Sequence, residues 1–289
     1  MTKRTQLTEA AHRIARLAVE EDGREDITSL IAVAKGTRAE ARIECRSGGV
    51  AAGLVFADAV AEVCSTRPAD WQVREGDEVA AGTVLGTMSG DLARLLRAER
   101  PMLNILQRAV GIATATRAYV DAVRGTSCRV LHTRKTAPGL RALDIAAVLA
   151  GGGAAHRADL ARTVMVKDNH WRALELAGRT LADALADARR RKVEGLQVEV
   201  ETAEQVESAC LAGATRLLVD NQLPATVADW AARARALSPG IEIEATGGIT
   251  LSNVREYADA GADYVSIGAL THSVSAGDVA IEITDGAAP

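Results

Sequence analysis

The chain has 289 residues, which is long enough for one large domain or for two unequal ones. Apolar residues make up 48% and charged residues 25%, as in an ordinary globular protein. Aromatic residues make up only 2%, so we expect a core of Ala, Val, Leu and Ile. The formal net charge of -4 argues against a general role in binding nucleic acid or an anionic membrane surface.

Targeting signals and disulfides are not expected. The first 23 residues lack an apolar signal core, and no run of about 18 apolar residues is long enough to cross a membrane, so we expect a cytoplasmic protein. The four cysteines form no close pair and are interpreted as small buried hydrophobic residues. Only five of the 34 basic residues are Lys, which draws attention to each of them.

The N-terminal region predicts an α+β domain. Amphipathic helices are expected over 6–21 and 53–65. Between and after them, residues 41–53 and 73–90 alternate apolar positions with Gly and Asp, as hairpins do. A helix is expected over 90–100.

A second helix is expected to start at Pro101 and to run to Gly125. Proline suits the first turn of a helix, because the N–H that it lacks has no partner there. The two helical segments are therefore predicted to be separate.

From residue 128 onward, short apolar strands alternate with helices, which is typical of parallel βαβ units. Six or seven such units predict a closed β/α barrel. The expected strands are 128–135, 163–169, 196–201, 216–221, 241–248 and 264–269. The expected helices are 141–150, 178–191, 203–212, 223–237 and 251–260.

Each expected strand begins apolar and ends polar. In a β/α barrel the carboxyl ends of all strands meet at one face, and this face carries the active site. A purely structural role would require burying many charges, which is costly. The polar strand ends are His132–Lys135, Lys167–Asn169, Glu199–Glu201, Asp220–Asn221, Thr246–Gly248 and Gly268.

Basic residues at this face predict a ligand with several negative charges. Arginine binds carboxylate or phosphate with two hydrogen bonds, and lysine adds a point charge. The set comprises Arg134, Lys135, His156, Arg157 and Lys167.

Carboxylates at neighbouring strand ends predict a Mg²⁺ ion. Glu199, Glu201 and Asp220 would hold it together with ligand oxygens, since Mg²⁺ is commonly bound through one or two carboxylates. Alternatively, these carboxylates neutralise the nearby lysines as ion pairs.

Glycine-containing turns follow the last two strands, at Thr246–Gly248 and over 267–273. Such loops bind phosphate through backbone N–H groups in β/α barrels, and His272 is a further candidate contact. Phosphate at one end, Mg²⁺ near the middle and an acid in the basic pocket describe phosphoribosyl pyrophosphate with an acid acceptor.

Several motifs in this order resemble the quinolinate phosphoribosyltransferase family. The upstream helix AERPMLNILQRAVGIATATRAYVDAVRG and the segments EDITS and RSGGVAAGL extend the resemblance over nearly the whole chain. The motifs of the second half are TRKTAPGLRAL, AGGGAAHR, VKDNH, LVDN, TGGI and VSIGALTHS.

The resemblance implies an α/β fold in which an incomplete β/α barrel, over 111–270, follows an N-terminal α+β sandwich-like domain, over 1–110. Residues 271–289 would return to the N-terminal domain. The implied reaction transfers phosphoribosyl to quinolinate, releases pyrophosphate and CO₂, and forms nicotinate mononucleotide. The family is usually dimeric, and Arg100 matches an arginine that reaches the neighbouring site.

The resemblance also assigns roles at the site. Lys135, Lys167, Glu199 and Asp220 are implied as catalytic residues, the last two also as ligands of Mg²⁺. The implied substrate-binding residues are Arg100, Arg134, Lys135, His156, Arg157, Lys167, Thr246, Gly247, Gly248, Gly268 and His272.

The sequence departs from the family pattern near the acceptor pocket. Ile145 to Ala147 stand where Lys-Tyr-Ala is expected, Ala155 replaces Asn, and His132 replaces Asp. These changes leave open a paralogue that accepts another pyridine acid, or a phosphoribosyltransferase-like protein associated with molybdate transport. Two further alternatives are a non-catalytic binder of an oxyanion or a pterin-like ligand, and a sugar-phosphate isomerase.

Overall fold

The computed structural model describes residues 3–23, 25–193 and 195–284. The chain divides into two compact units. Unit 1 comprises 1–117, 135–152 and 269–289, and unit 2 comprises 118–134 and 153–268. The predicted boundaries at 110 and 270 lie close to two of these divisions. They place 135–152 in the barrel, however, whereas the structure packs this segment into unit 1.

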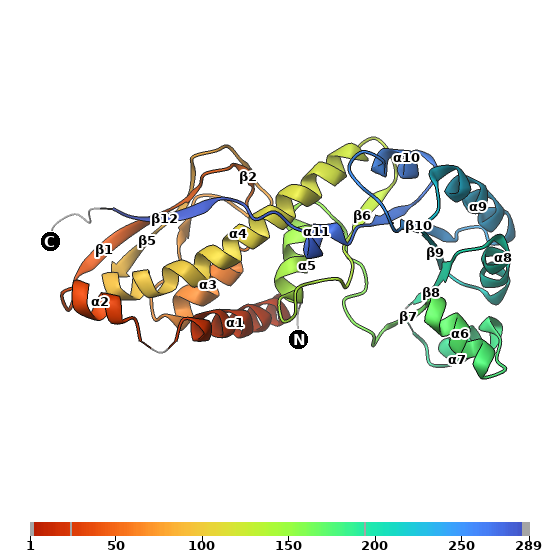
Figure 1. The fold of residues 1–289 in the computed structure, drawn as a ribbon, viewed down its shortest axis with the longest axis horizontal. Coiled ribbons are helices and arrows are strands. Elements are labelled where there is room, and N and C mark those ends of the chain that lie inside the picture. The colour runs from red at the N-terminus through yellow and green to blue at the C-terminus, as the bar shows by residue number, and fades with distance from the viewer. Residues whose placement is uncertain (1–2, 24, 194, 285–289) are drawn as a thin grey trace. The chain divides into compact units, whose positions relative to one another are not determined.

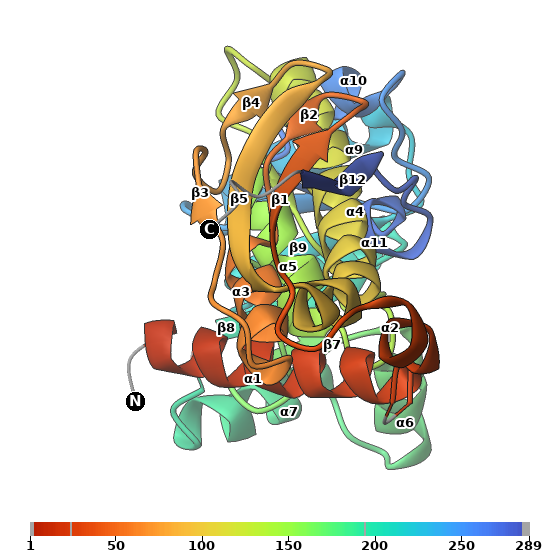
Figure 2. The same cartoon turned by 90° about the vertical axis from the view of Figure 1, so that its left-hand side faces the viewer.

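Unit 1 contains a four-stranded antiparallel sheet in the order β12-β1-β5-β3 (Figures 1 and 2). Strand β12, from near the C-terminus, pairs with β1 so that Glu40 lies opposite Thr284. Residues 285–289 of the predicted returning segment lie outside the described residues. The unit 1 strands are β1 (Arg38–Cys45), β2 (Gly49–Val50), β3 (Asp70–Trp71), β4 (Glu78–Val79), β5 (Thr83–Asp91) and β12 (Val279–Thr284).

Helices line one face of this sheet. Every second residue of β1 is buried, from Ala39 to Cys45, as expected for a strand with one face on the core. The predicted helices 6–21 and 53–65 correspond to α1 and α3, which pack against each other. The helices with residues in unit 1 are α1 (Lys3–Glu21), α2 (Ile27–Ala32), α3 (Leu54–Val63), α4 (Leu92–Ala122), α5 (Arg141–Ala150) and α11 (Ala269–His272).

The predicted helix start at Pro101 is wrong, because α4 passes through this residue without a break. A proline inside a helix costs about 3 kcal/mol, since it removes one hydrogen bond and crowds the preceding turn. Ala98, Met102 and Leu106 are fully buried at a four-residue spacing on both sides of the proline. Burial of this continuous apolar stripe outweighs the local cost.

Unit 2 is a six-stranded sheet in the order β6-β11-β10-β9-β8-β7, in which every pairing is parallel. Its strands are β6 (Arg129–Leu131), β7 (Thr163–Val166), β8 (Gly195–Val200), β9 (Arg216–Asp220), β10 (Glu242–Thr246) and β11 (Tyr264–Ser266). Its helices are α6 (Asp168–Leu176), α7 (Leu181–Arg190), α8 (Ala203–Ala212), α9 (Pro224–Leu237) and α10 (Val254–Asp259).

The sheet of unit 2 is not a closed barrel, which corrects the prediction made from the number of βα units and agrees with the incomplete barrel that the resemblance implies. Among the described strands, β6 and β7 are the two edges and do not pair with each other. The reason is strand number, because the closed form of this architecture needs eight strands. Next to β6, the Ala154 N–H donates to the Val130 carbonyl at 2.7 Å, so the chain after Gly153 lies along that edge.

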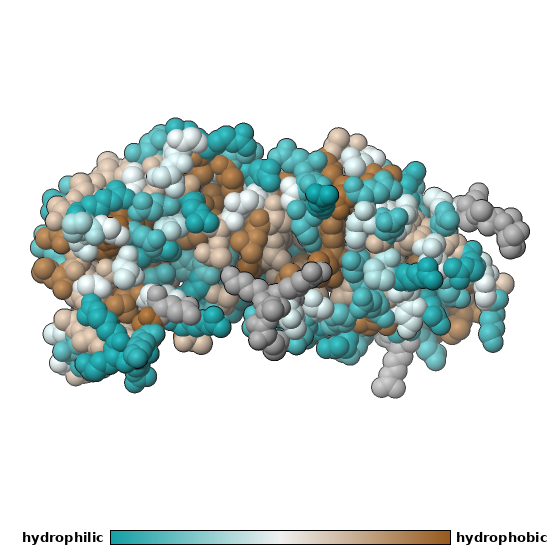
Figure 3. Space-filling view, turned by 180° about the vertical axis from the view of Figure 1, so that it is seen from behind, coloured by the Kyte–Doolittle hydropathy of each residue, from teal (hydrophilic) through white to brown (hydrophobic). Residues whose placement is uncertain are grey.

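Hydrophilic side chains cover much of the face drawn in Figure 3, with hydrophobic ones interspersed among them. In the parts of the chain that the structure describes, no helix is both long and apolar enough to span a bilayer.

Candidate active site

The carboxyl ends of the unit 2 strands gather most of the predicted site residues. Lys167 directly follows β7, and Glu199 lies next to the last residue of β8. Asp220 and Thr246 end β9 and β10 and are register partners in the parallel sheet. Arg134 follows β6 by three residues. These five residues therefore lie at or just beyond the carboxyl ends of parallel strands, the ends that share one edge of the sheet.

Lys167 and Glu199 form an ion pair between β7 and β8. The Glu199 side chain is 8% exposed, whereas that of Lys167 is 40% exposed and so remains open to a ligand. The VKDNH motif explains the local geometry. His170 Nδ1 accepts the Lys167 backbone N–H at 3.0 Å, and Trp171 Nε1 donates to the Glu199 carbonyl at 2.9 Å. Helix α6, which was not predicted from the sequence, thus begins directly after Lys167, and Trp171 ties it to β8.

Asp220 and the Gly247 turn are coupled through Asn221. The Asn221 backbone has φ +53°, and its side-chain amide donates to Asp220 Oδ2 at 2.7 Å. Its N–H donates to the Thr246 carbonyl at 2.9 Å. Gly247 has φ +82°, and a Cβ there would lie 2.2 Å from Asn221 Oδ1. Gly248 also has a positive φ of +63°. Only glycine fits this close approach, which leaves the backbone of the turn accessible.

Two arginines lie together without enough anions to pair them. Arg134 Nε is buried and has no hydrogen-bond partner among the described residues. Burial lowers the pKa of the nearby Arg157 guanidinium, the charge on Arg134 lowers it further, and Glu244 and Glu199 partly oppose the change. A buried donor without a partner is costly, so this pair fits an anionic ligand.

Glu244, which is not among the predicted site residues, lies beside the His156 ring. Glu244 is 1% exposed, and its Oε2 lies 3.3 Å from His156 Nε2 and 3.1 Å from an Arg216 guanidinium nitrogen. Burial alone would raise the pKa of Glu244, but His156 and Arg216 hold it below its usual range. The sequence contains a pattern that points to this carboxylate. Glu242 and Glu244 alternate with apolar residues in IEIEA, so their side chains share one face of the strand.

Four of the remaining site residues are divided between the two units. Gly268 ends unit 2, whereas Arg100, Lys135 and His272 belong to unit 1. Arg100 is exposed on α4, and His272 is exposed at the end of α11. Lys135 is exposed, and its carbonyl accepts the Thr271 hydroxyl at 2.8 Å. The structure thus joins the segments that carry Lys135 and His272.

The carboxylates suit a Mg²⁺ ion that takes only one or two of its ligands from the protein. No group of three or more His, Cys, Asp or Glu side chains is placed to hold a metal ion in the described part of the chain. Glu199 and Asp220 on adjacent strands fit an ion that takes one or two carboxylates and completes its shell with phosphate and water oxygens. Glu201, the third predicted carboxylate, is exposed, and its N–H donates to Gln205.

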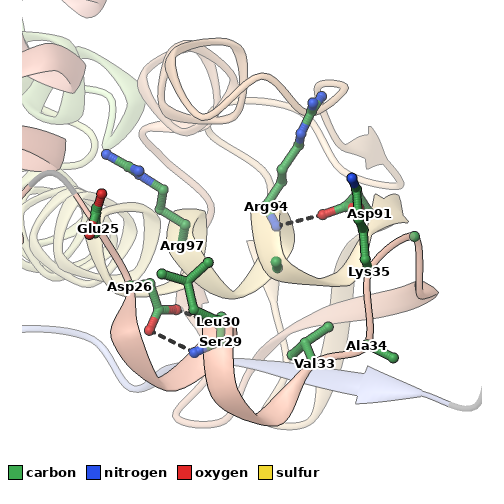
Figure 4. A pocket seen from close by; sticks show the side chains of 12 residues that line it. Glu25, Asp26, Ser29, Leu30, Val33, Ala34, Lys35, Asp91, Arg94 and Arg97 are labelled. Carbon is green, nitrogen blue, oxygen red and sulfur yellow. Dashed lines mark hydrogen bonds between the residues drawn. The ribbon is translucent and has the colours of Figure 1, made fainter.

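Unit 1 contains a separate pocket of 570 Å³ between α2 and the start of α4 (Figure 4). Its lining combines Leu30 and Val33 with charged residues such as Arg94 and Arg97. None of the predicted site residues lines it.

Comparison with known proteins first defines the class. A solved nicotinate-nucleotide pyrophosphorylase from Francisella tularensis superposes with a TM-score of 0.88 at 27% identity, covering 96% of this chain and 97% of that one. A nicotinate-nucleotide pyrophosphorylase [carboxylating] from Mycobacterium leprae is 38% identical over 95% of this chain and 98% of its own length. A probable one from Bacillus subtilis is 37% identical over 85% of this chain and 83% of its own length.

Family models identify the chain more narrowly. Residues 26–110 match the quinolinate phosphoribosyl transferase N-terminal domain, and residues 112–282 match the C-terminal domain of the same family. The chain belongs to the quinolinate phosphoribosyl transferase family.

Proposed function

We propose that this protein transfers the phosphoribosyl group of phosphoribosyl pyrophosphate to quinolinate in NAD biosynthesis. The products are nicotinate mononucleotide, pyrophosphate and CO₂. Family membership supports the reaction, and the names of the Mycobacterium leprae and Bacillus subtilis relatives describe the same one.

The observation that carries the proposal is the pair of arginines without matching anions. Arg134 has a buried Nε without a partner in the described chain, and Arg157 lies half-buried beside it with a lowered pKa. A dicarboxylate such as quinolinate would supply the missing acceptors and offset the repulsion between the two guanidinium groups. A simple sugar-phosphate site does not need this second basic cluster in addition to the Gly247 turn.

Carboxylates and a lysine at the next strand ends suit the transfer step. As pyrophosphate leaves C1 of the ribose, positive charge develops on the sugar, and Glu199 and Asp220 are placed on adjacent strands to stabilise it. Lys167, already paired with Glu199, is exposed enough to contact the departing phosphate oxygens. After transfer, the cationic ring stabilises the electron pair that remains on C2 when the C2–carboxylate bond breaks and CO₂ leaves. A proton from water then takes the place of the carboxylate at C2, so no organic cofactor is needed.

The proposed reaction includes Mg²⁺, which Glu199 and Asp220 would bind. When bound, the ion would neutralise charge on the pyrophosphate leaving group. The chain itself contributes position and fixed charge, since Trp171 and His170 hold Glu199 and Lys167 in place.

We further propose a homodimer in the cytoplasm. Arg100 is an exposed arginine on helix α4, which suits a residue that reaches the neighbouring site. The four cysteines are free and buried, which fits a reducing compartment.

A spectrophotometric assay for nicotinate mononucleotide tests the reaction. We expect turnover with quinolinate, phosphoribosyl pyrophosphate and Mg²⁺, and loss of turnover in Lys135→Ala and Lys167→Ala without unfolding. Retained activity in both variants would mean that the site is misplaced. Turnover with another pyridine acid, but not with quinolinate, would identify a paralogue and point to His132 and Ala155.

The shared site is tested by complementation. Arg100→Ala and Lys167→Ala are each expected to be inactive, and mixing the two should restore activity in hybrid dimers that contain one intact site. No recovery after mixing would contradict a site completed by Arg100 of a second copy.

A further inference from the structure

His156 is held at two points inside unit 2. Its backbone N–H donates to His132 Nε2 at 3.0 Å, and its own Nε2 lies 3.3 Å from Glu244 Oε2, although this N–H is not aligned for a hydrogen bond. The side chain of His156 is 6% exposed. Among the residues that the structure describes, none hydrogen-bonds to its Nδ1, which remains available to a ligand.

His132 holds the backbone of His156 by acting as a neutral acceptor. The imidazole of His132 is 1% exposed, and its Nδ1 lies 3.3 Å from the Thr133 carbonyl oxygen. A carbonyl only accepts hydrogen bonds, so Nδ1 carries the hydrogen and Nε2 accepts. Because the chain from Ala154 also pairs with edge strand β6, the main-chain position of His156 follows from that strand.

Glu244 holds the ring of His156 from a fixed position. It lies on β10 between Ile243 and Ala245, which are fully buried, and an Arg216 nitrogen lies 3.1 Å from its Oε2. Arg216 is itself fixed by Glu242 at 2.8 Å. The Glu244 carboxylate therefore cannot turn toward solvent.

Stability alone does not explain this arrangement, since a buried ion pair adds little net stability compared with apolar residues of similar volume. A carboxylate behind a histidine has a recurrent effect in metal sites, where it fixes the orientation of the ring and places the other nitrogen toward the ligand. Here Glu244 lies on the Nε2 side of the His156 ring, so Nδ1 is the ring nitrogen left for a ligand.

We propose that Glu244 and His132 are positioning residues that direct His156 Nδ1 to a carboxylate of the acid acceptor, with His156 as an imidazolium whose Nε2–H faces Glu244 and whose Nδ1–H donates to the acceptor. The inference rests on the proposed function, because it takes the ligand of His156 to be a pyridine dicarboxylate. It predicts that acceptor binding depends on two residues that do not touch the acceptor. Binding of phosphoribosyl pyrophosphate should not depend on them.

Glu244→Gln and Glu242→Gln form a matched pair. Each substitution neutralises one carboxylate of β10 that pairs with Arg216. Only Glu244 also lies beside His156. We expect Glu244→Gln to raise the KM for quinolinate about 10- to 100-fold, the usual effect of losing such a supporting group. The KM for phosphoribosyl pyrophosphate should change less than about twofold, and Glu242→Gln should change neither by more than this margin.

His132 is tested by conservative rescue. In His132→Gln, the side-chain oxygen can take the place of Nε2 and accept the His156 N–H, whereas His132→Leu offers no acceptor. We expect His132→Leu to weaken quinolinate binding in calorimetry at least about tenfold, the loss that follows from an unpaired buried donor, and His132→Gln to restore most of it. Thermal unfolding confirms that each variant is folded.

Equal effects of Glu244→Gln and Glu242→Gln on quinolinate, or equal effects on both substrates, would overturn the inference. Equal affinities of His132→Leu and His132→Gln for quinolinate would also overturn it. If the wild-type protein binds quinolinate without turning it over, and the variants follow the expected pattern, the proposed reaction fails and the positioning role stands.

Discussion

The ion pair between Arg108 and Asp144 is expected to hold the segments that carry Lys135 and His272. The Asp144 side chain is fully buried and accepts hydrogen bonds from Arg108 at 2.7 and 2.8 Å. It also accepts the Ala137 N–H at 3.1 Å, two residues after Lys135. Arg108 in turn donates to the Thr271 carbonyl, directly before His272.

Asp144→Asn removes the charge and turns amide hydrogens toward donors. The Arg108 side chain is only 22% exposed, so it would be left as a largely buried cation without its partner. Breaking a buried pair in this way costs about 3 to 5 kcal/mol. At about 2 to 4 °C per kcal/mol, the expected fall in Tm is on the order of 10 °C.

Thermal unfolding followed by circular dichroism measures the change. Asp259→Asn is the control, because Asp259 pairs with Arg255 on the surface, where both side chains are more than half exposed. Such a pair is worth about 0 to 1 kcal/mol, so the Tm of this control should fall by about 4 °C at most. Replacing both Arg108 and Asp144 with Leu should recover much of the lost stability. Equal Tm values for Asp144→Asn and Asp259→Asn would refute the assigned role of the pair.

Three further predictions concern the site, the glycine turn and the cysteines. Arg157→Met should raise the KM for quinolinate at least about tenfold, because a charge-assisted hydrogen bond is lost, and should leave the KM for phosphoribosyl pyrophosphate nearly unchanged in steady-state assays. Gly247→Ala should lower the Tm more than Gly240→Ala, because both have positive φ but only the first meets a neighbour, Asn221. Burial raises the pKa of the Cys128 thiol to about 12, so its alkylation by iodoacetamide at pH 8.5, followed by mass spectrometry, should be slow until the protein unfolds.

Each of these has a clear contrary outcome. Equal changes in the KM of both substrates for Arg157→Met would show a general loss of structure rather than a role in acceptor binding. Equal Tm values for the two glycine variants would show that the neighbourhood of Gly247 adapts. Fast alkylation of Cys128 in the native protein would show that unit 2 opens around it.

Local sequence patterns predicted most elements because strand and helix periods are short-range properties. Helices α5 and α8 begin and end where the pattern placed them, at 141–150 and 203–212. Pro101 shows the limit of local rules, since the apolar stripe of α4 continues through it and packing overrides the local cost. Helix α6 was missed because its start depends on the hydrogen bond between His170 and Lys167.

The site residues likewise fall into those that the sequence predicts and those that only the structure shows. Arg134, Lys167, Glu199, Asp220 and Thr246 could be found from the sequence, because parallel strands must bring their carboxyl ends to one face of the sheet. The charge distribution by itself thus predicts an anion-binding face.

Tertiary structure alone decided how these groups are supported. His132, Glu244 and Arg216 lie on different strands or beside them, and the sequence does not show that they converge on His156. It likewise could not show that 135–152 packs with unit 1. The physical reason is that which side chains face a given atom depends on strand order and register. Both are set by long-range pairing and not by the local period.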